Sequence, residues 1–206
     1  MRCPADVEEA RSLLEQRLPC IRVRRLEVRP GERAAAVLLP ILDAGGGEDG
    51  PALLLERRAG NLGNHAGQYA FPGGVADPGD ASPVATALRE AHEETGLEAE
   101  RVRVVGRLSD IRTPTGFVIT PVVGVVEGRP RLSPHEEEVE ELVLLPLCEL
   151  LKDDAFVMVR RRARGVLMHG HALVYRGRII WGATARMLMA LRRVLRGPEG
   201  GCPRVG

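Results

Sequence analysis

Apolar and polar positions recur with two different periods along this chain, and the two periods predict different elements. Residues 5–18 show the helical period, with apolar side chains among charged ones, and this pattern predicts an amphipathic helix. Two runs rich in leucine and valine, 34–42 and 52–56, flank the Gly/Asp-rich segment 43–50, which indicates a strand, a loop and a strand. We interpret the first helix as an arm packed onto the domain that follows.

A helix over 83–95 is the most sharply bounded element that the sequence predicts. Ser82 stands at the capping position, Pro83 at the first helical position, and Gly96 directly after the last helix former. A serine side chain can accept a hydrogen bond from a free backbone N–H, and proline there sacrifices no helical hydrogen bond. Glycine adopts the left-handed conformation that ends many helices.

The remaining pattern is dominated by strands with helices around them. The segment 60–79 is rich in glycine and proline and predicts a long ordered loop or a strand broken by turns. An apolar stretch covers 142–151. Strand-like runs lie at 102–105, 118–126, 156–159 and 172–175, and a final amphipathic helix is expected over 183–195. The expected fold class is therefore mixed α/β.

Length and composition favour one domain with flanking arms. The chain has 206 residues, of which 44% are hydrophobic and 28% charged, with a formal net charge of +1. Such a balance indicates neither disorder nor a surface for polyanions. We expect an N-terminal helical arm over 1–30, a single domain over 31–196, and a flexible tail over 197–206.

The four cysteines lie far apart and form no CxxC pair, so neither a zinc ribbon nor a dense disulfide framework is indicated. No apolar run reaches the length of roughly 20 residues that a transmembrane helix needs. The N-terminus carries acidic residues early and lacks the apolar core of a signal peptide. These features predict a cytoplasmic protein that does not associate with membranes.

The helix over 83–95 carries three carboxylates on one narrow stripe. Glu90 and Glu94 are one turn apart, and Glu93 lies on the adjoining ridge. Their mutual repulsion is relieved by a cation, and hard Mg²⁺ prefers oxygen ligands. The alternative is a solvated acidic face on which Arg89 pairs with Glu93 at i+4. The preceding Phe71-Pro72-Gly73-Gly74 favours the metal hypothesis, because glycines allow a ligand to approach the backbone closely.

These residues resemble the Nudix box. Gly74, five residues, Asp80, eight residues and then the run REAHEETGL from Arg89 to Leu97 follow its pattern, with Asp80 in place of the usual Glu and one extra residue before Arg89. The resemblance implies a Nudix fold, in which a mixed β-sheet is sandwiched between helices, and Mg²⁺- or Mn²⁺-dependent hydrolysis of a pyrophosphate. It also implies that Glu90 and Glu94 hold the metal, that Glu93 assists with a further ion, and that the Gly74 carbonyl completes the site.

Two catalytic residues are expected from this resemblance, Glu93 and a general base for the attacking water. Glu138 is the candidate base, from the acidic run His135 to Val139, although that run also fits a solvated loop. Arg89 is expected to orient Glu93 rather than to touch the substrate.

Further segments resemble the coenzyme A pyrophosphatase subfamily of Nudix hydrolases. They are Leu54 to Ala59, His65 to Gly74, and Trp181 to Ala185, with Glu56 replacing a Thr and Gly63 replacing an Arg of the subfamily signature. The resemblance implies that coenzyme A or acyl-coenzyme A is the substrate. Arg57, Arg58 and His65 are candidates for binding its phosphates, with surface charge as the alternative interpretation.

Other readings of the sequence stay open or are disfavoured. The same chemistry could act on ADP-ribose, a dinucleoside polyphosphate or a damaged nucleotide, or the domain could be a ligand-binding module without catalysis. A homodimer is possible. The run Arg160 to Arg164 lacks interleaved aromatic residues, so we expect no nucleic-acid partner. His169 and His171 lack a third ligand nearby, which disfavours a zinc site.

Overall fold

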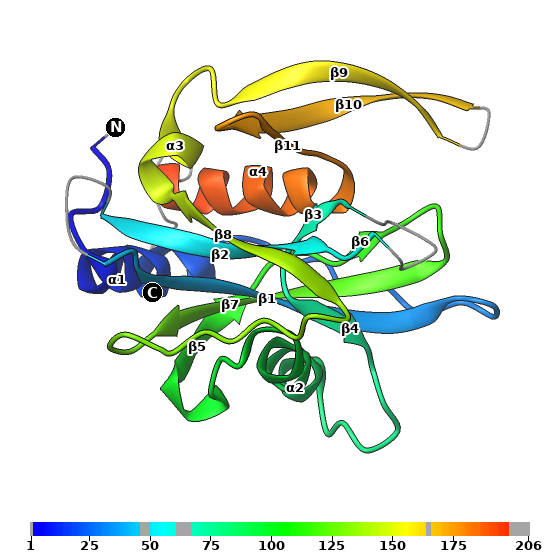
Figure 1. Ribbon diagram of the computed structural model, residues 1–206, viewed down its shortest axis with the longest axis horizontal. Coiled ribbons are helices and arrows are strands. Elements are labelled where there is room, and N and C mark those ends of the chain that lie inside the picture. Colours follow the sequence, from blue (N-terminus) through cyan, green and yellow to red (C-terminus); the bar gives the residue numbers. More distant parts are fainter. Residues whose placement is uncertain (1, 46–49, 61–66, 164–165, 198–206) are drawn as a thin grey trace.

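The computed structural model describes residues 2–45, 50–60, 67–163 and 166–197, which are arranged in layers (Figure 1). Helix α2 (Pro83–Thr95) covers one face of a central sheet, and helices α1 (Val7–Arg17) and α4 (Gly182–Arg196) cover the other. A mixed sheet between helices is the fold class expected from the sequence, and the expectation is confirmed.

The central sheet is built around strand β1. This strand pairs in parallel with β7 and antiparallel with β2 and β4, which makes the sheet mixed. Strand β3 pairs with β2, β5 and β6 pair with β7, and β8 pairs with β2. The strands are β1 (Arg33–Asp43), β2 (Pro51–Arg58), β3 (Tyr69–Ala70), β4 (Gly73–Val75), β5 (Val102–Arg107), β6 (Ile111–Arg112), β7 (Phe117–Val126) and β8 (Val139–Pro146).

Alternation along strand β2 divides its side chains between the two faces of the sheet. Leu53 and Leu55 belong to the apolar cluster that includes α1 and α4, whereas Leu54 belongs to the cluster that includes α2. Because side chains alternate along a strand, Glu56 follows Leu54 toward α2, and Arg57 follows Leu55 to the opposite face. Neighbouring residues of the sequence therefore serve two different regions of the molecule.

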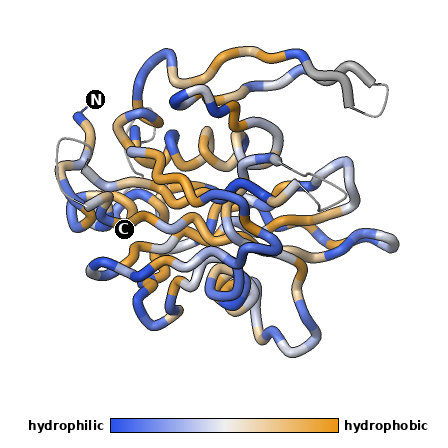
Figure 2. Tube along the Cα trace, in the orientation of Figure 1, coloured by the Kyte–Doolittle hydropathy of each residue, from blue (hydrophilic) through white to orange (hydrophobic). Residues whose placement is uncertain are grey.

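A second sheet covers helix α4 on the side away from the central sheet (Figure 1). It consists of the antiparallel strands β9 (Phe156–Ala163), β10 (Val166–Tyr175) and β11 (Arg178–Ile180), and the short helix α3 (Leu147–Leu151) leads into it. Apolar segments run through the central strands, whereas α2 is largely hydrophilic (Figure 2). The buried apolar residues of helix α2 are small, Ala87 and Ala91, which lets the helix lie close to the sheet.

The predicted boundaries of α2 are confirmed. The Ser82 hydroxyl accepts a hydrogen bond from the Ala85 N–H at 3.2 Å, and Gly96 ends the helix with a φ of 70°. Helices α1 and α4 also form where the apolar period placed them. Most of the predicted tail, from 198 to 206, lies outside the described residues.

A disulfide joins Cys3 to Cys148 across a separation of 145 residues. It ties the segment before α1 to helix α3. The cysteine spacing had indicated no disulfide framework, and this bond was missed because only the folded chain brings the two residues together. Among the described residues, none of the helices has both the length and the apolar character needed to cross a bilayer.

Candidate active site

The three carboxylates of α2 differ sharply in burial. Glu94 is 3% exposed, the Glu90 side chain 17% and the Glu93 side chain 55%. Exposure of the side chains on this helix face therefore decreases from Glu93, which lies in solvent, through Glu90 to Glu94, which is buried. An evenly solvated acidic face, the alternative weighed from the sequence, does not describe this arrangement.

The turn at Gly73 and Gly74 interlocks with two of these carboxylates. The Gly73 N–H donates a hydrogen bond to Glu94 Oε2 at 2.7 Å. A Cβ added to Gly74 would lie 2.4 Å from Glu90 Oε2, closer than any real contact. Strand β4, which contains both glycines, is fixed to β1 by the register Val37 to Gly73. The backbone thus approaches the carboxylates directly, as the glycines had suggested.

Arg89, in the middle of α2, connects the helix to the loop before it. Its Nε and Nη2 atoms lie 3.1 and 3.0 Å from the two carboxylate oxygens of Asp80, and its Nη1 lies 2.9 Å from Glu93. Its Nη2 also lies 3.0 Å from Glu90. The hydrogen bonds from Arg89 hold the pKa of Asp80 well below its usual range. Asp80 thus anchors Arg89 despite the extra residue in the loop, and the ion pair expected between Arg89 and Glu93 is present.

A fourth carboxylate, Glu56 on β2, lies beside Glu94 and was not among the candidates from the sequence. Arg58 Nη1 is 3.6 Å from Glu56 Oε1 and 3.6 Å from Glu94 Oε1, so one guanidinium contacts both. Glu56 is fully buried. The sequence analysis treated it only as a departure from a signature. Its spacing of two from Leu54 places both side chains on one face of β2, but the run of leucines does not indicate which face meets α2.

Burial makes these carboxylates costly to ionise. The pKa of Glu94 is raised first by burial and then by the neighbouring charge of Glu56. Burial likewise raises the pKa of Glu56, against the opposing effect of Arg58, and raises the pKa of Glu90, against that of Arg89. A site that accumulates buried carboxylates is stabilised by additional positive charge.

Glu138 belongs to an exposed segment between β7 and β8. Backbone hydrogen bonds join this segment to the ends of β2 and α2. Its carbonyl accepts a hydrogen bond from the Ala59 N–H at 2.8 Å, and the His135 N–H donates to the Glu94 carbonyl at 2.9 Å. The charge of Glu138 contributes to the raised pKa of both Glu56 and Glu90.

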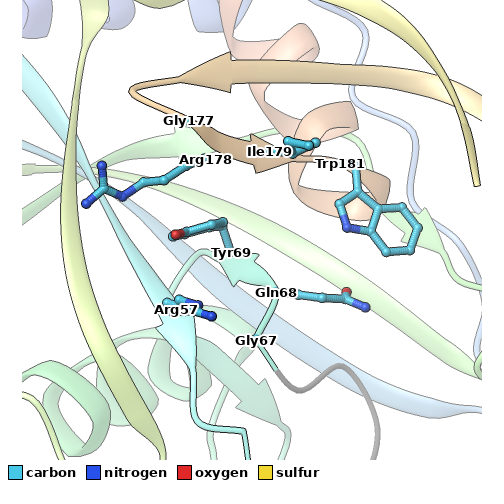
Figure 3. Close-up of a pocket in the computed structure, with 8 residues that line it drawn as sticks. All are labelled: Arg57, Gly67, Gln68, Tyr69, Gly177, Arg178, Ile179 and Trp181. Carbon is cyan, nitrogen blue, oxygen red and sulfur yellow. The ribbon is translucent and has the colours of Figure 1, made fainter.

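The two arginines proposed from the sequence occupy opposite faces of β2. Arg58 contacts the carboxylates, whereas Arg57 lines a pocket of about 440 Å³ (Figure 3). Tyr69 and Trp181 border the same pocket. Arg57 Nη1 lies 2.8 Å from Glu140, and Arg178, also in the pocket, pairs with Glu141. His65 and Gly63 lie outside the described residues.

The remaining candidates lie elsewhere. His169 and His171 are exposed residues of the second sheet, where His169 pairs with Arg160. Within the described ranges, no three His, Cys, Asp or Glu side chains already form a group that could hold a metal. At the α2 site, Arg58 and Arg89 instead contact the carboxylates.

Comparisons with known proteins agree with this geometry. Residues 32–166 match the family described as NUDIX domain. An uncharacterized Nudix hydrolase NudL from Photorhabdus laumondii is 40% identical over 159 residues, which cover 77% of this chain and 83% of the relative. Its counterpart from Pectobacterium atrosepticum is 41% identical over 165 residues, which cover 78% and 81%.

Among solved structures, a MutT/nudix family protein from Enterococcus faecalis has a TM-score of 0.58 and 17% identity, with 85% of this chain and 67% of that chain covered. This likeness concerns the fold. The sandwich, the carboxylate helix and the sequence matches together define a hydrolase. The chain belongs to the Nudix hydrolase family, whose members bind nucleotide derivatives and generally use divalent metal ions.

Proposed function

We propose that this protein is a Mg²⁺- or Mn²⁺-dependent pyrophosphohydrolase that cleaves coenzyme A into 3′,5′-ADP and 4′-phosphopantetheine, and acyl-coenzyme A correspondingly. One observation carries the choice of substrate. The segments that resemble coenzyme A pyrophosphatases are far apart in the sequence, yet Arg57, Tyr69 and Trp181 from these segments line a single pocket. The opposite face of the same strand β2 carries Glu56 and Arg58 beside the carboxylates of α2.

The residues at the α2 site fit a hard divalent cation. They offer carboxylate oxygens, two of the carboxylates, Glu56 and Glu94, are almost fully buried, and the glycine turn brings the backbone close to Glu90 and Glu94. Glu90 and Glu94 would hold the ion, with Glu93 and the Gly74 carbonyl completing the site. When bound, Mg²⁺ or Mn²⁺ supplies neutralisation of the phosphoryl oxygens and activation of water.

The side chains around the ion have separate tasks in this proposal. Glu138 accepts a proton from the attacking water, whose oxygen forms a bond to one phosphorus as the bridging oxygen of the pyrophosphate departs with the other. Its exposed position leaves it room to meet that water. Arg89 keeps Glu93 and Glu90 in place through contacts of 2.9 and 3.0 Å.

The pocket suits the flanking group of the substrate. Coenzyme A differs from ADP-ribose mainly in its 3′-phosphate and its pantetheine arm, so selectivity requires a cation and apolar walls. Arg57 provides the cation, and Tyr69 and Trp181 provide the walls (Figure 3). The pair between Arg57 and Glu140 is half-exposed, so a phosphate can compete for the guanidinium.

A substrate panel tests this proposal. The panel contains coenzyme A, acetyl-coenzyme A, ADP-ribose, NADH and nucleoside triphosphates, each assayed with Mg²⁺, with Mn²⁺ and with chelator. Coenzyme A is expected to give the highest kcat/KM, and chelator to abolish turnover. If the kcat/KM for ADP-ribose or a triphosphate exceeds that for coenzyme A by more than about tenfold, roughly 1.4 kcal/mol, coenzyme A is not the preferred substrate. The assignment as a hydrolase would be unaffected. A chain that binds one of these ligands without turnover would be a binding module.

The Arg57→Ala variant tests the role of the pocket independently of the reaction centre. We expect the KM for coenzyme A to rise by about one to two orders of magnitude, with a smaller effect on the KM for ADP-ribose, because one charged contact to phosphate contributes roughly 1.5 to 3 kcal/mol. Arg101→Ala is the matched control, since Arg101 is an exposed arginine paired with Glu98. Equal effects of Arg57→Ala on both substrates would argue against a role in selectivity.

A further inference from the structure

Glu56 stands out as a buried charge with little to satisfy it. The side chain is 0% exposed, and among the residues that the structure describes neither of its carboxylate oxygens accepts a hydrogen bond from a backbone N–H or a basic, amide or hydroxyl side chain; its polar neighbour is another carboxyl, that of Glu94. Among the described residues, the nearest cationic atom, Arg58 Nη1, lies 3.6 Å away, beyond hydrogen-bonding distance. A buried carboxylate without hydrogen bonds is destabilising unless another group compensates it.

Among the described residues, those paired with Glu56 on the sheet include no neutral side-chain hydrogen-bond donor, and those on the α2 side include Glu94 of the candidate metal site. On the sheet it is paired with Ala70 of β3 and Leu142 of β8, whose side chains can donate no hydrogen bond. Across the interface with α2 it meets Glu94, and the same atom of Arg58 lies 3.6 Å from each carboxylate. Two buried carboxylates thus converge on one position that a positive charge occupies.

We propose that Glu56 is an additional carboxylate of the divalent-cation site, which shares the ion with Glu94 when the Arg58 guanidinium gives way. This inference rests on the proposed metal-dependent function. The signature that the strand resembles has Thr at this position, and a hydroxyl contributes no charge. The site of this chain therefore carries one more negative charge, and it should bind its cation more tightly than a site with Thr would.

A purely structural Glu56, which would serve only to hold Arg58, makes a different prediction. In that case, removal of the charge loosens Arg58 and destabilises the protein with or without metal. If Glu56 instead belongs to the cation site, its negative charge destabilises the metal-free protein and stabilises the metal-bound protein. Neutral substitution should then raise the Tm of the metal-free protein while it reduces the further rise caused by Mn²⁺.

The experiment compares wild type, Glu56→Gln and Glu56→Thr by electron paramagnetic resonance of free Mn²⁺ and by thermal unfolding, with and without Mn²⁺. Glu98→Gln is the matched control, because Glu98 is an exposed carboxylate paired with Arg101. We expect both Glu56 variants to bind Mn²⁺ at least about tenfold more weakly and the control to bind as wild type does. Glu56→Thr supplies a second variant, with the residue of the resembled signature, in case glutamine packs poorly.

The outcomes separate this inference from the function on which it rests. Wild-type Mn²⁺ affinity in both Glu56 variants overturns the role of Glu56 and leaves the metal-dependent function intact. A lower metal-free Tm in both variants, together with an unchanged rise on addition of Mn²⁺, assigns Glu56 a structural role and also overturns the inference. A wild-type protein that binds no Mn²⁺ contradicts the proposed function itself.

Discussion

The Glu90 carboxylate occupies the space in which a side chain on Gly74 would begin, since a Cβ there would lie 2.4 Å from Glu90 Oε2. We therefore expect Gly74→Ala to displace Glu90 and to lower kcat by at least about 10²-fold, because small misplacements of reacting groups are costly. Steady-state hydrolysis measures the effect. Gly79→Ala is the control, because nothing lies within 4 Å of a Cβ at that position. Equal activity of the two variants would show that Glu90 has no fixed role.

Neutralising the carboxylates of α2 should remove activity while the fold remains. Glu94→Gln and Glu90→Gln are each expected to lower kcat by at least about 10²-fold, because each removes charge that binds the cation. Glu93→Gln should have a smaller effect on cation affinity, since its side chain is 55% exposed. Circular dichroism checks the fold. Wild-type turnover by the Glu90 and Glu94 double variant would show that the metal role is wrong.

The contact between Asp80 and Arg89 should make stability depend on pH. The pKa of Asp80 is lowered in the folded protein, so its contribution is present above the unfolded value of about 3.9 and is lost as pH falls through the lower folded value. We expect Asp80→Asn to lower the Tm at pH 6 and the difference between variant and wild type to narrow progressively as pH falls below about 3.9.

Thermal unfolding between pH 2 and pH 6 measures this convergence. Asp77→Asn is the control, because the Asp77 side chain is 68% exposed and lies 3.6 Å from Arg89. Curves for Asp80→Asn and wild type that stay parallel over the whole range would contradict the assignment of the shift to this contact.

The disulfide between Cys3 and Cys148 should stabilise the fold by restricting the unfolded chain. It closes a loop with a separation of 145 residues, for which the chain-entropy model gives an upper value of about 5 kcal/mol. Replacement of both cysteines by serine should lower the free energy of unfolding by roughly 2 to 5 kcal/mol in urea titrations. The reductant-dependent loss of stability should also be smaller in this variant than in wild type. An equal loss in both proteins would mean that the bond contributes nothing.

Local signals in the sequence were sufficient for the elements whose causes are local. Helix α2 could be bounded because Ser82, Pro83 and Gly96 act within one turn of its ends. The stripe of Glu90 and Glu94 followed from helical spacing alone. That the helix and the turn at Gly73 and Gly74 form one site came from the Nudix resemblance, because the hydrophobic period of the sequence does not indicate it.

The features that were missed depend on contacts between distant segments. Glu56 lies in a strand that is buried on both faces, and such a strand does not reveal which position meets a carboxylate from another element. The faces of Arg57 and Arg58 could not be distinguished until β2 was placed against α2 and β11. The bond between Cys3 and Cys148 likewise requires the finished fold, because pairing cannot be deduced from spacing.

The pairing of β2 with β8 also determines when during synthesis the proposed catalytic centre can form. Strand β2 and helix α2 leave the ribosome first, but β2 gains its β8 neighbour over 52–58 only from residues 139–146, and Glu138 arrives with them. Pairings between such distant segments form late in folding. A chain whose translation stops before β8 therefore has an open strand edge and no candidate base. Under the proposed mechanism, fragments from aborted translation are expected to be inactive, and hydrolysis to begin only once the later strands have been made.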